Sequence, residues 1–336
     1  MLTLMESPWI SYHQTVTESL AKLIGTKENE VVAMITTNLH LLIVSFYRPN
    51  KKGYKTVIEK QAFPSDYYAI LSQLKFHSFS KDDLIEVASK LSCFTIDTSY
   101  FLQVLEDNGD NIVLVLLSEH NTTGQVFDMP ALIKKWHDIV GIDLAHAVGN
   151  ISIELHNWEA DFAVLVLVAS KGFLHMENIL IPKLRRIYGW WGNNPATCFE
   201  MKLIFEPINS VKVWQLSNPS ILQPVSLRAS LNIFNTVGIG PLRQKSICLT
   251  GYLNFLFTKC STGNFSIFTS SNLEERECQL FIKFLNYSNH FFRYLQQGIA
   301  CDYSHPEVIG VAPVSLCNSF FEVFKFYQII DIGLYL

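Results

Sequence analysis

The middle of the chain carries two short hydrophobic runs, and each run ends at a polar side chain that can do chemistry. The first run ends at Asp143, three residues before His146. The second run covers residues 162–169 and ends at Ser170 and Lys171. Short apolar runs with polar boundaries are typical of buried parallel strands. The pattern therefore predicts two neighbouring strands with an acid and a lysine at their carboxyl ends.

An acid and a lysine in this arrangement indicate a cofactor site. Open α/β sheets bind ligands in the crevice at the carboxyl ends of their strands. A lysine that forms an imine and an acid that holds a pyridinium nitrogen are the two groups that pyridoxal 5'-phosphate needs most. We therefore interpret Asp143 and Lys171 as the two ends of a site for this cofactor.

Strand-like and helix-like segments alternate on both sides of this stretch. Strands separated by helices are typical of α/β proteins, so we expect a mainly parallel central sheet flanked by helices. We also expect a large domain at 1–223, followed by a connecting helix and a small α/β domain at 224–336. The predicted strands are 30–35, 54–59, 111–117, 265–269, 278–284 and 299–303, and the predicted helices are 11–24, 81–90, 97–107, 130–138, 225–235, 241–259, 288–297 and 320–330.

Composition and charge exclude several classes of protein. The chain has 336 residues with 49% hydrophobic and 17% charged side chains, which is typical of a globular protein with a sizeable core. The net charge is −4, and the basic residues are scattered, so we expect no nucleic-acid partner. The longest apolar run, 162–169, is much shorter than the roughly 20 residues of a membrane span.

The seven cysteines are spread singly, without a CxxC pair. This spacing argues against a zinc site and is typical of reduced thiols in the cytosol. The first residues lack a basic stretch followed by an apolar core, so we expect no secretory signal and a cytoplasmic protein.

Single side chains elsewhere allow more than one interpretation. Thr36 precedes an apolar helical run, where it caps the helix or helps its free N–H groups to hold an anion. Phe63 is a core aromatic or a ring stacked on a planar cofactor. Asp66 caps the helix that follows it. Trp190 lies between glycines in a packed loop or a lid, and Asn218 lies in a connector or in a turn that lines a cavity.

Ten segments, taken together and in order, resemble the kynureninase family. From about residue 8 to the C-terminus, the motifs cover nearly the whole chain, and each of them alone is weak. The segments are TTNLHLL, QAFPSD, TGQVFDM, IDLAHAVGN, LHNWEADFA, GWWGNN, WQLSNPSIL, LRQKSICLTGYL, LEERECQL and GVAPVSLCNSF.

This resemblance implies a fold, a cofactor and a reaction. The fold is that of the aspartate aminotransferases (fold type I), and the protein is a homodimer with pyridoxal phosphate. The enzyme hydrolyses L-kynurenine to anthranilate and L-alanine, or 3-hydroxykynurenine to 3-hydroxyanthranilate, in tryptophan degradation and NAD synthesis.

The resemblance also implies roles for individual residues. Asp143 salt-bridges the pyridine nitrogen, with His146 beside it, and Lys171 is the candidate for the Schiff base. The other matching positions are Ile35 and Thr36 at the phosphate, Phe63 stacked on the ring, Asp66 in the same cofactor motif, and Trp190 and Asn218 near the phosphate and substrate across the dimer interface.

The chain departs from the family pattern in four places. A family segment with a GNSLG-type motif is absent at the N-terminus, and VASKGFLHM replaces SYKYLN with its glycine-rich continuation. Relative to Asp161, Lys171 comes about two residues late, which keeps the strand face but moves the lysine by roughly 6–7 Å. The arginine that clamps the substrate carboxylate is replaced by Gly310, and the tyrosine before TGQ is replaced by Thr122.

These departures leave two alternatives to an active kynureninase. One is a catalytically impaired or dead homologue that acts only as a binding or dimerisation protein. The other is a different fold-type I enzyme such as a cysteine desulfurase, although no cysteine lies in a recognisable catalytic loop.

Overall fold

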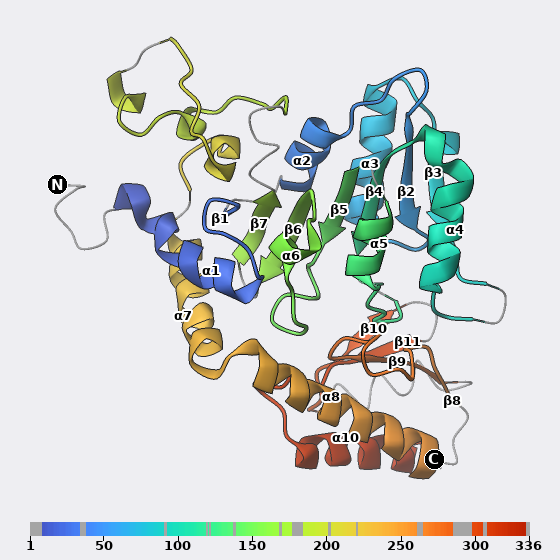
Figure 1. Ribbon diagram of the computed structural model, residues 1–336. Coiled ribbons are helices and arrows are strands. Elements are labelled where there is room, and N and C mark those ends of the chain that lie inside the picture. The colour runs from blue at the N-terminus through green and yellow to red at the C-terminus, as the bar shows by residue number, and fades with distance from the viewer. Residues whose placement is uncertain are drawn as a thin grey trace.

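Two β-sheets organise the chain, a seven-stranded large sheet and a four-stranded small sheet (Figure 1). The structure is a computed structural model, and it describes residues 9–33, 38–90, 93–118, 120, 122–136, 139–167, 170–176, 184–200, 203–219, 221–260, 265–284, 298–304 and 308–333.

The large sheet is mainly parallel, as the sequence predicts. Its strand order is β1-β7-β6-β5-β4-β2-β3, and only the pairs β1–β7 and β7–β6 are antiparallel. Nearly every residue of the central strand β4 is buried, because helices cover both faces of the sheet and leave no face for polar side chains. The strands are β1 (Val31–Ala33), β2 (Lys55–Glu59), β3 (Leu84–Val87), β4 (Ile112–Ser118), β5 (Ile139–Asp143), β6 (Phe162–Leu167) and β7 (Ser170–Met176).

The helices begin at residues suited to that position. Asp97 and Asp128 each accept a hydrogen bond from a backbone N–H of the following first turn, and Pro64 opens its helix at a position where no N–H is needed. Among the described residues, no helix is long and apolar enough to cross a membrane. The α-helices are α1 (Thr17–Leu23), α2 (Asn38–Phe46), α3 (Pro64–Phe76), α4 (Thr98–Asn108), α5 (Met129–Lys135), α6 (Leu155–Trp158), α7 (Leu222–Val237), α8 (Ile239–Phe255) and α10 (Phe320–Gly333).

Shorter helical turns connect these elements. Most are 3-10 turns, and the last is a π-helical turn that continues α8. They are η1 (Trp9–Val16), η2 (Lys81–Asp83), η3 (Gly109–Asn111), η4 (Trp190–Gly192), η5 (Cys198–Glu200), η6 (Val211–Trp214) and η7 (Leu256–Cys260).

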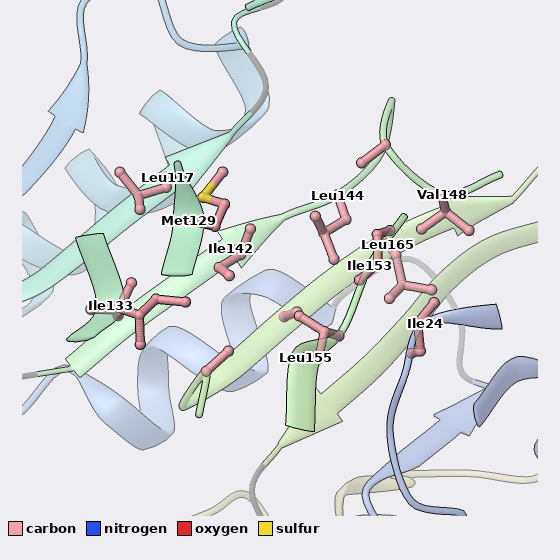
Figure 2. Close-up of a cluster of buried hydrophobic side chains, with 14 of the residues drawn as sticks. Ile24, Leu117, Met129, Ile133, Ile142, Leu144, Val148, Ile153, Leu155 and Leu165 are labelled. Carbon is pink, nitrogen blue, oxygen red and sulfur yellow. The ribbon is translucent and has the colours of Figure 1, made fainter. Parts of the chain in front are cut away.

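Two apolar clusters hold the large sheet, one on each face. Figure 2 shows part of the first cluster, in which Met129 of α5 packs near Leu117 and Ile142 of neighbouring strands. The second cluster joins α2, α3 and η6 to the other face. There the buried indole of Trp214 donates from Nε1 to Ser45 Oγ at 2.9 Å, which satisfies both polar groups in the core.

The small sheet packs on α8 and α10. Its strands are β8 (Phe265–Ile267), β9 (Leu280–Phe284), β10 (Asp302–Ser304) and β11 (Val308–Val311), in the order β10-β11-β9-β8, and all pairs are antiparallel. Leu253 of α8, Ile282 of β9 and Ile330 of α10 are fully or almost fully buried in its core.

Backbone hydrogen bonds join the small sheet to the loop after β4. Val126 N donates to Glu275 O at 2.9 Å, and Glu277 N donates to Gly124 O at 3.2 Å. Arg243 of α8 strengthens this joint, since its Nη2 donates to Arg276 O at 2.9 Å. The small sheet is therefore held close to the carboxyl end of a central strand.

Several local predictions need correction. The predicted helix at 81–90 is wrong: a 3-10 turn is followed by β3, because Leu84–Val87 pair along β2 and this long-range pairing overrides local helix propensity. The prediction that Ser170 and Lys171 end the strand at 162–169 is also wrong: these two residues open β7, which pairs antiparallel with β6. The predicted helix at 11–24 begins as a 3-10 turn and becomes α-helical only at Thr17. The predicted helix at 288–297 lies outside the described residues.

Gly141 gives a test of the packing beneath the end of β5. A Cβ at this position would lie 2.1 Å from Phe162 Cζ on the neighbouring strand. We expect Gly141→Ala to lower the free energy of unfolding by about 1–3 kcal/mol or more, because the core cannot accept the methyl group without displacing that ring. Urea unfolding checks this value.

Gly240→Ala is the matched control for this substitution. Nothing lies within 4 Å of a Cβ built at Gly240 in α8, so alanine there leaves stability unchanged or raises it by up to about 1 kcal/mol. Equal effects of the two substitutions would contradict the packing described for β5.

Candidate functional site

Polar side chains end three adjacent strands of the large sheet. The last residues of β5, β4 and β2 are Asp143, Ser118 and Glu59, and these strands are neighbours in the sheet. Ser118 and Asp143 are direct register partners. Because the three strands are parallel, their carboxyl ends meet at one edge, where open α/β sheets bind ligands.

Glu59 is a buried carboxyl at this edge. Its side chain is only 1% exposed, and its Oε1 accepts a hydrogen bond from Ser118 Oγ. Its other oxygen, Oε2, is buried without a hydrogen-bond donor. Burial raises the pKa of Glu59 to about 7. The hydrogen bond from Ser118 favours the charged form and opposes this shift.

Asp66 adds a second buried carboxyl from the first turn of α3, so the prediction that it caps this helix is wrong, because Phe63 occupies the N-cap position. Its side chain is 2% exposed, and Ser65 Oγ donates to its Oδ1 at 3.3 Å, while Oδ2 is buried without a donor. Burial raises the pKa of Asp66 to about 6.

Asp143 faces Asp66 and completes the cluster. Its Oδ1 accepts from Ala145 N at 2.8 Å. Burial, and next the negative charge of Asp66, raise the pKa of Asp143 well above its ordinary value, and Glu59 adds to this shift. We call Glu59, Asp66 and Asp143 the carboxyl cluster.

The carboxyl cluster fits a bound cation. Two buried carboxyls, Glu59 and Asp66, and the partly exposed Asp143 beside them cannot all ionise easily unless a positive charge is close. No N–H or hydroxyl group donates to Glu59 Oε2 or Asp66 Oδ2, and the carboxyls of Asp66 and Asp143 interact directly with each other. The protonated nitrogen of a pyridine ring supplies both a charge and an N–H donor, so the residues present fit pyridoxal phosphate. Among the described residues, no group of three or more metal-ligating side chains could hold a metal ion.

Phe63 and His146 lie next to members of this cluster. Phe63 precedes Pro64 at the start of α3, and its ring is 51% exposed, which leaves a face for a planar ligand. His146 lies in the turn after β5 with an exposed side chain. Partial desolvation lowers the pKa of His146, and the negative charge of Asp302 from β10 opposes that shift.

The backbone of Lys171 lies at the same edge of the large sheet. Lys171 pairs with Val166 of β6, and Asp143 pairs with Val164 of the same strand. Lys171 is therefore two residues beyond the level of Asp143 along β6. Its side chain is outside what the structure describes, and so are Ile35 and Thr36 as whole residues.

Among the described residues, neither Trp190 nor Asn218 hydrogen-bonds to the carboxyl cluster. The segment that contains Trp190 extends at the upper left of Figure 1, whereas the small sheet lies at the lower right. Trp190 is 47% exposed and donates from Nε1 to Cys198 O at 3.1 Å. Asn218 is exposed and accepts from Ser217 Oγ at 3.1 Å.

The sequence analysis missed three polar residues of this edge. Glu59 and Ser118 belong to it, as described above. His120, just after β4, is 4% exposed, and its ring nitrogens contact Lys60 O at 3.1 Å and Thr122 Oγ1 at 3.0 Å. A polar residue at the end of a buried strand is the signal that identifies Asp143, and the same signal marks Glu59 and Ser118, while His120 follows two residues after β4.

Comparison with known proteins identifies the family. Residues 242–330 match the family model described as the kynureninase C-terminal domain. A kynureninase of Koribacter versatilis is 40% identical over 96% of this chain and 80% of the relative. A kynureninase of Rattus norvegicus is 38% identical over 96% of this chain and 75% of the relative. This chain belongs to the kynureninase family.

Solved structures confirm the fold of this kynureninase-family chain. The apo cysteine desulfurase from Thermococcus onnurineus superposes with a TM-score of 0.81 at 15% identity, over 99% of this chain and 86% of that one. A C-DES mutant with glycine covalently linked to its PLP cofactor gives a TM-score of 0.78 at 14% identity, over 95% and 85%. The predicted fold type I is thus confirmed, while the relatives at higher identity are kynureninases rather than desulfurases.

Gly310, where the resemblance predicts an arginine, is buried in β11. Gly310 pairs with Asp302 of β10, and a Cβ at Gly310 would lie 3.2 Å from Phe281 Cε1 and 3.6 Å from Asp302 Cβ. A side chain there would share the face of Asp302, whose charge acts on His146 of the large sheet.

Asp66 gives a pH test of the cluster in cofactor-free protein. The folded state raises the pKa of Asp66 from about 4 to about 6, so between these values it binds more protons than the unfolded state. Stability therefore falls as pH rises through this window. In wild type, this effect should lower the free energy of unfolding by about 2–3 kcal/mol between pH 4 and 7. We expect Asp66→Asn to lack this decrease, as measured by urea unfolding at each pH.

Asp110→Asn, at an exposed position in η3, is the matched control and should leave the pH dependence unchanged. Parallel pH curves for wild type and Asp66→Asn would contradict the burial of an unpaired carboxyl.

Proposed function

We propose that this chain is a pyridoxal-phosphate-dependent hydrolase that cleaves the Cβ–Cγ bond of L-kynurenine or 3-hydroxy-L-kynurenine. One water is consumed, and anthranilate or 3-hydroxyanthranilate leaves together with L-alanine. The observation that carries the proposal is the carboxyl cluster, which gathers three acidic side chains at the strand ends and would favour a cation there. Relatives that are named kynureninase support the substrate class and a place in tryptophan degradation and NAD synthesis.

Residues of the cluster would hold the cofactor ring. Bound pyridoxal phosphate supplies a positively charged ring that takes up the electron pair left when a bond to the substrate α-carbon breaks. Asp143 keeps the proton on the ring nitrogen, and Asp66 Oδ2 provides a second acceptor. Phe63 stacks on the ring, and His146 lies beside Asp143.

The remaining contacts of the proposed site come from the segments around it. Ile35 and Thr36 precede α2, whose first N–H groups would bind the phosphate. Lys171 forms the covalent bond to the cofactor and carries the proton of the substrate α-carbon. Its backbone position at the carboxyl edge, next to the end of β6, supports this role.

A homodimer explains why Trp190 and Asn218 are far from the cluster of their own chain. Exposed apolar side chains gather in the segment around Trp190, including Tyr188, Phe199 and Leu203, which is typical of a protein interface. In the proposed dimer, Trp190 and Asn218 of one chain reach the cofactor phosphate and substrate of the other.

We also propose the two-domain division 1–223 and 224–336, and a cytoplasmic compartment. The start of α7 near the proposed boundary supports the division. Free thiols at all the cysteines whose side chains the structure describes support a reducing compartment.

The catalytically impaired alternative rests on Gly310 and on the surroundings of Lys171. Against it, the carboxyl cluster is whole, and the family relatives favour an active kynureninase. The absence of an arginine at position 310 affects substrate binding and leaves the cofactor residues unchanged.

Lys171→Ala tests the function. Wild-type protein loaded with pyridoxal phosphate should form anthranilate from L-kynurenine, followed by its fluorescence, and borohydride reduction should label Lys171 in the peptide map. The variant should lose at least about 10³-fold in kcat, since the covalent and proton-carrying group is gone. The exposed control Lys51→Ala should keep full activity. Absence of anthranilate with wild-type protein, or a label at other lysines, would refute the proposal.

Gly310→Arg tests the substrate carboxylate contact. The Cβ of the new side chain alone requires the Phe281 ring to shift by a few tenths of an ångström. A bidentate contact to the carboxylate should then raise kcat/KM for L-kynurenine by about 10–100-fold, chiefly through KM. Gly310→Met, equally bulky but uncharged, should give no gain. Equal effects of both variants would exclude a carboxylate contact at this position.

A further inference from the structure

We propose that Glu59 is a positioning residue for the ring nitrogen of the cofactor and acts through Ser118 and the pair Asp66–Asp143. When the ring cation binds, Glu59 gives up a proton to solvent. This inference rests on the proposed function. It adds a third carboxyl to the two that the family resemblance assigns.

Geometry supports a role at the ring rather than a role in the core. Glu59 ends β2, two strands away from Asp143, and Ser118 on the strand between them donates to its Oε1. Ser118 is the register partner of Asp143, so the three residues form one row along the edge. The second oxygen of Glu59, Oε2, is buried without a donor. A role as hydrogen-bond acceptor for Ser118 alone does not explain why this oxygen is kept away from water.

The groups that face Glu59 explain why its charge matters. They are the Ser118 hydroxyl from β4, the Asp66 carboxyl from α3 and the Asp143 carboxyl from β5. The ion pairs of the described residues include none between the Lys60 ammonium and Glu59. The backbone carbonyl of Lys60 contacts the His120 ring. Glu59 therefore titrates among carboxyls until a cation arrives from outside the protein.

Binding and protonation must then be coupled. In the protein without cofactor, burial keeps the proton on Glu59 up to a pKa of about 7. A cation held by Asp66 and Asp143 favours the ionised form of Glu59, so the cofactor binds more tightly when Glu59 is charged. The coupling is reciprocal: the ring nitrogen keeps its proton to higher pH when Glu59 is ionised.

Glu59→Gln tests the coupling, because glutamine keeps the shape of the side chain and removes its charge. The dissociation constant of pyridoxal phosphate is measured from pH 5.5 to 8 for wild type and variant. The ratio of variant to wild type should be close to 1 at pH 5.5 and rise to about 10 at pH 8, equivalent to a coupling of about one pKa unit. The variant should also release fewer protons on binding near pH 7, counted by calorimetry in two buffers with different ionisation enthalpies.

Glu86→Gln is the matched control, since Glu86 lies exposed on the neighbouring strand β3. Its ratio should stay near 1 at every pH. A merely structural role of Glu59 would weaken binding equally at all pH values, and that result would overturn the inference.

Ser118→Ala gives an independent test that keeps the carboxyl itself. Without the Ser118 donor, Glu59 loses a hydrogen bond that favours its charged form. The midpoint of the pH-dependent change in cofactor affinity should therefore move to higher pH than in wild type. An unchanged midpoint would also overturn the inference.

These outcomes separate the inference from the proposed function. Wild-type protein that binds no pyridoxal phosphate would refute both. Wild-type protein that binds it at Lys171, with a flat Glu59→Gln ratio, would refute only the role of Glu59.

Discussion

The meeting of Glu59, Asp66 and Asp143 at one edge of a sheet, the first two buried and the third partly exposed, is the constraint on which the site depends. None of the ion pairs formed by the described residues involves these three groups. Their burial therefore costs free energy in the protein alone and is compensated when a positive, hydrogen-bond-donating ring is bound. Binding sites commonly hold groups in such unfavourable states, because the ligand then supplies the missing interaction.

The rest of the large sheet keeps these groups in place. Apolar clusters on both faces fix β2, β4 and β5 side by side, so their last residues share one edge. Gly141 lets the Phe162 ring lie against β5 two residues before Asp143. The small sheet approaches this edge through the loop after β4 and brings Asp302 near His146. The large sheet thus carries the carboxyl cluster, and the small sheet places Asp302 near the same edge.

Much of this arrangement could be predicted from local sequence, and the remainder depends on contacts between distant segments. Asp143 stands out because its strand is a short apolar run that stops at an acid. Glu59 and Ser118 end their strands in the same way, but their meeting depends on the sheet order β5-β4-β2, which no local pattern encodes. Local sequence predicts a helix at Leu84–Val87. These residues form a strand because they pair with β2, and this pairing is equally non-local. The separation of Trp190 from the cluster also follows from the path of the chain rather than from its spacing.

The most direct test of the central claim is the protonation state of the ring nitrogen in the loaded protein. Nitrogen-15 NMR of the wild-type protein with pyridoxal phosphate labelled at the ring nitrogen reports this state. The carboxyl cluster predicts a pyridinium resonance that persists from pH 6 to 8. A neutral pyridine resonance at neutral pH would show that the three carboxyls do not hold a cation and would contradict this account.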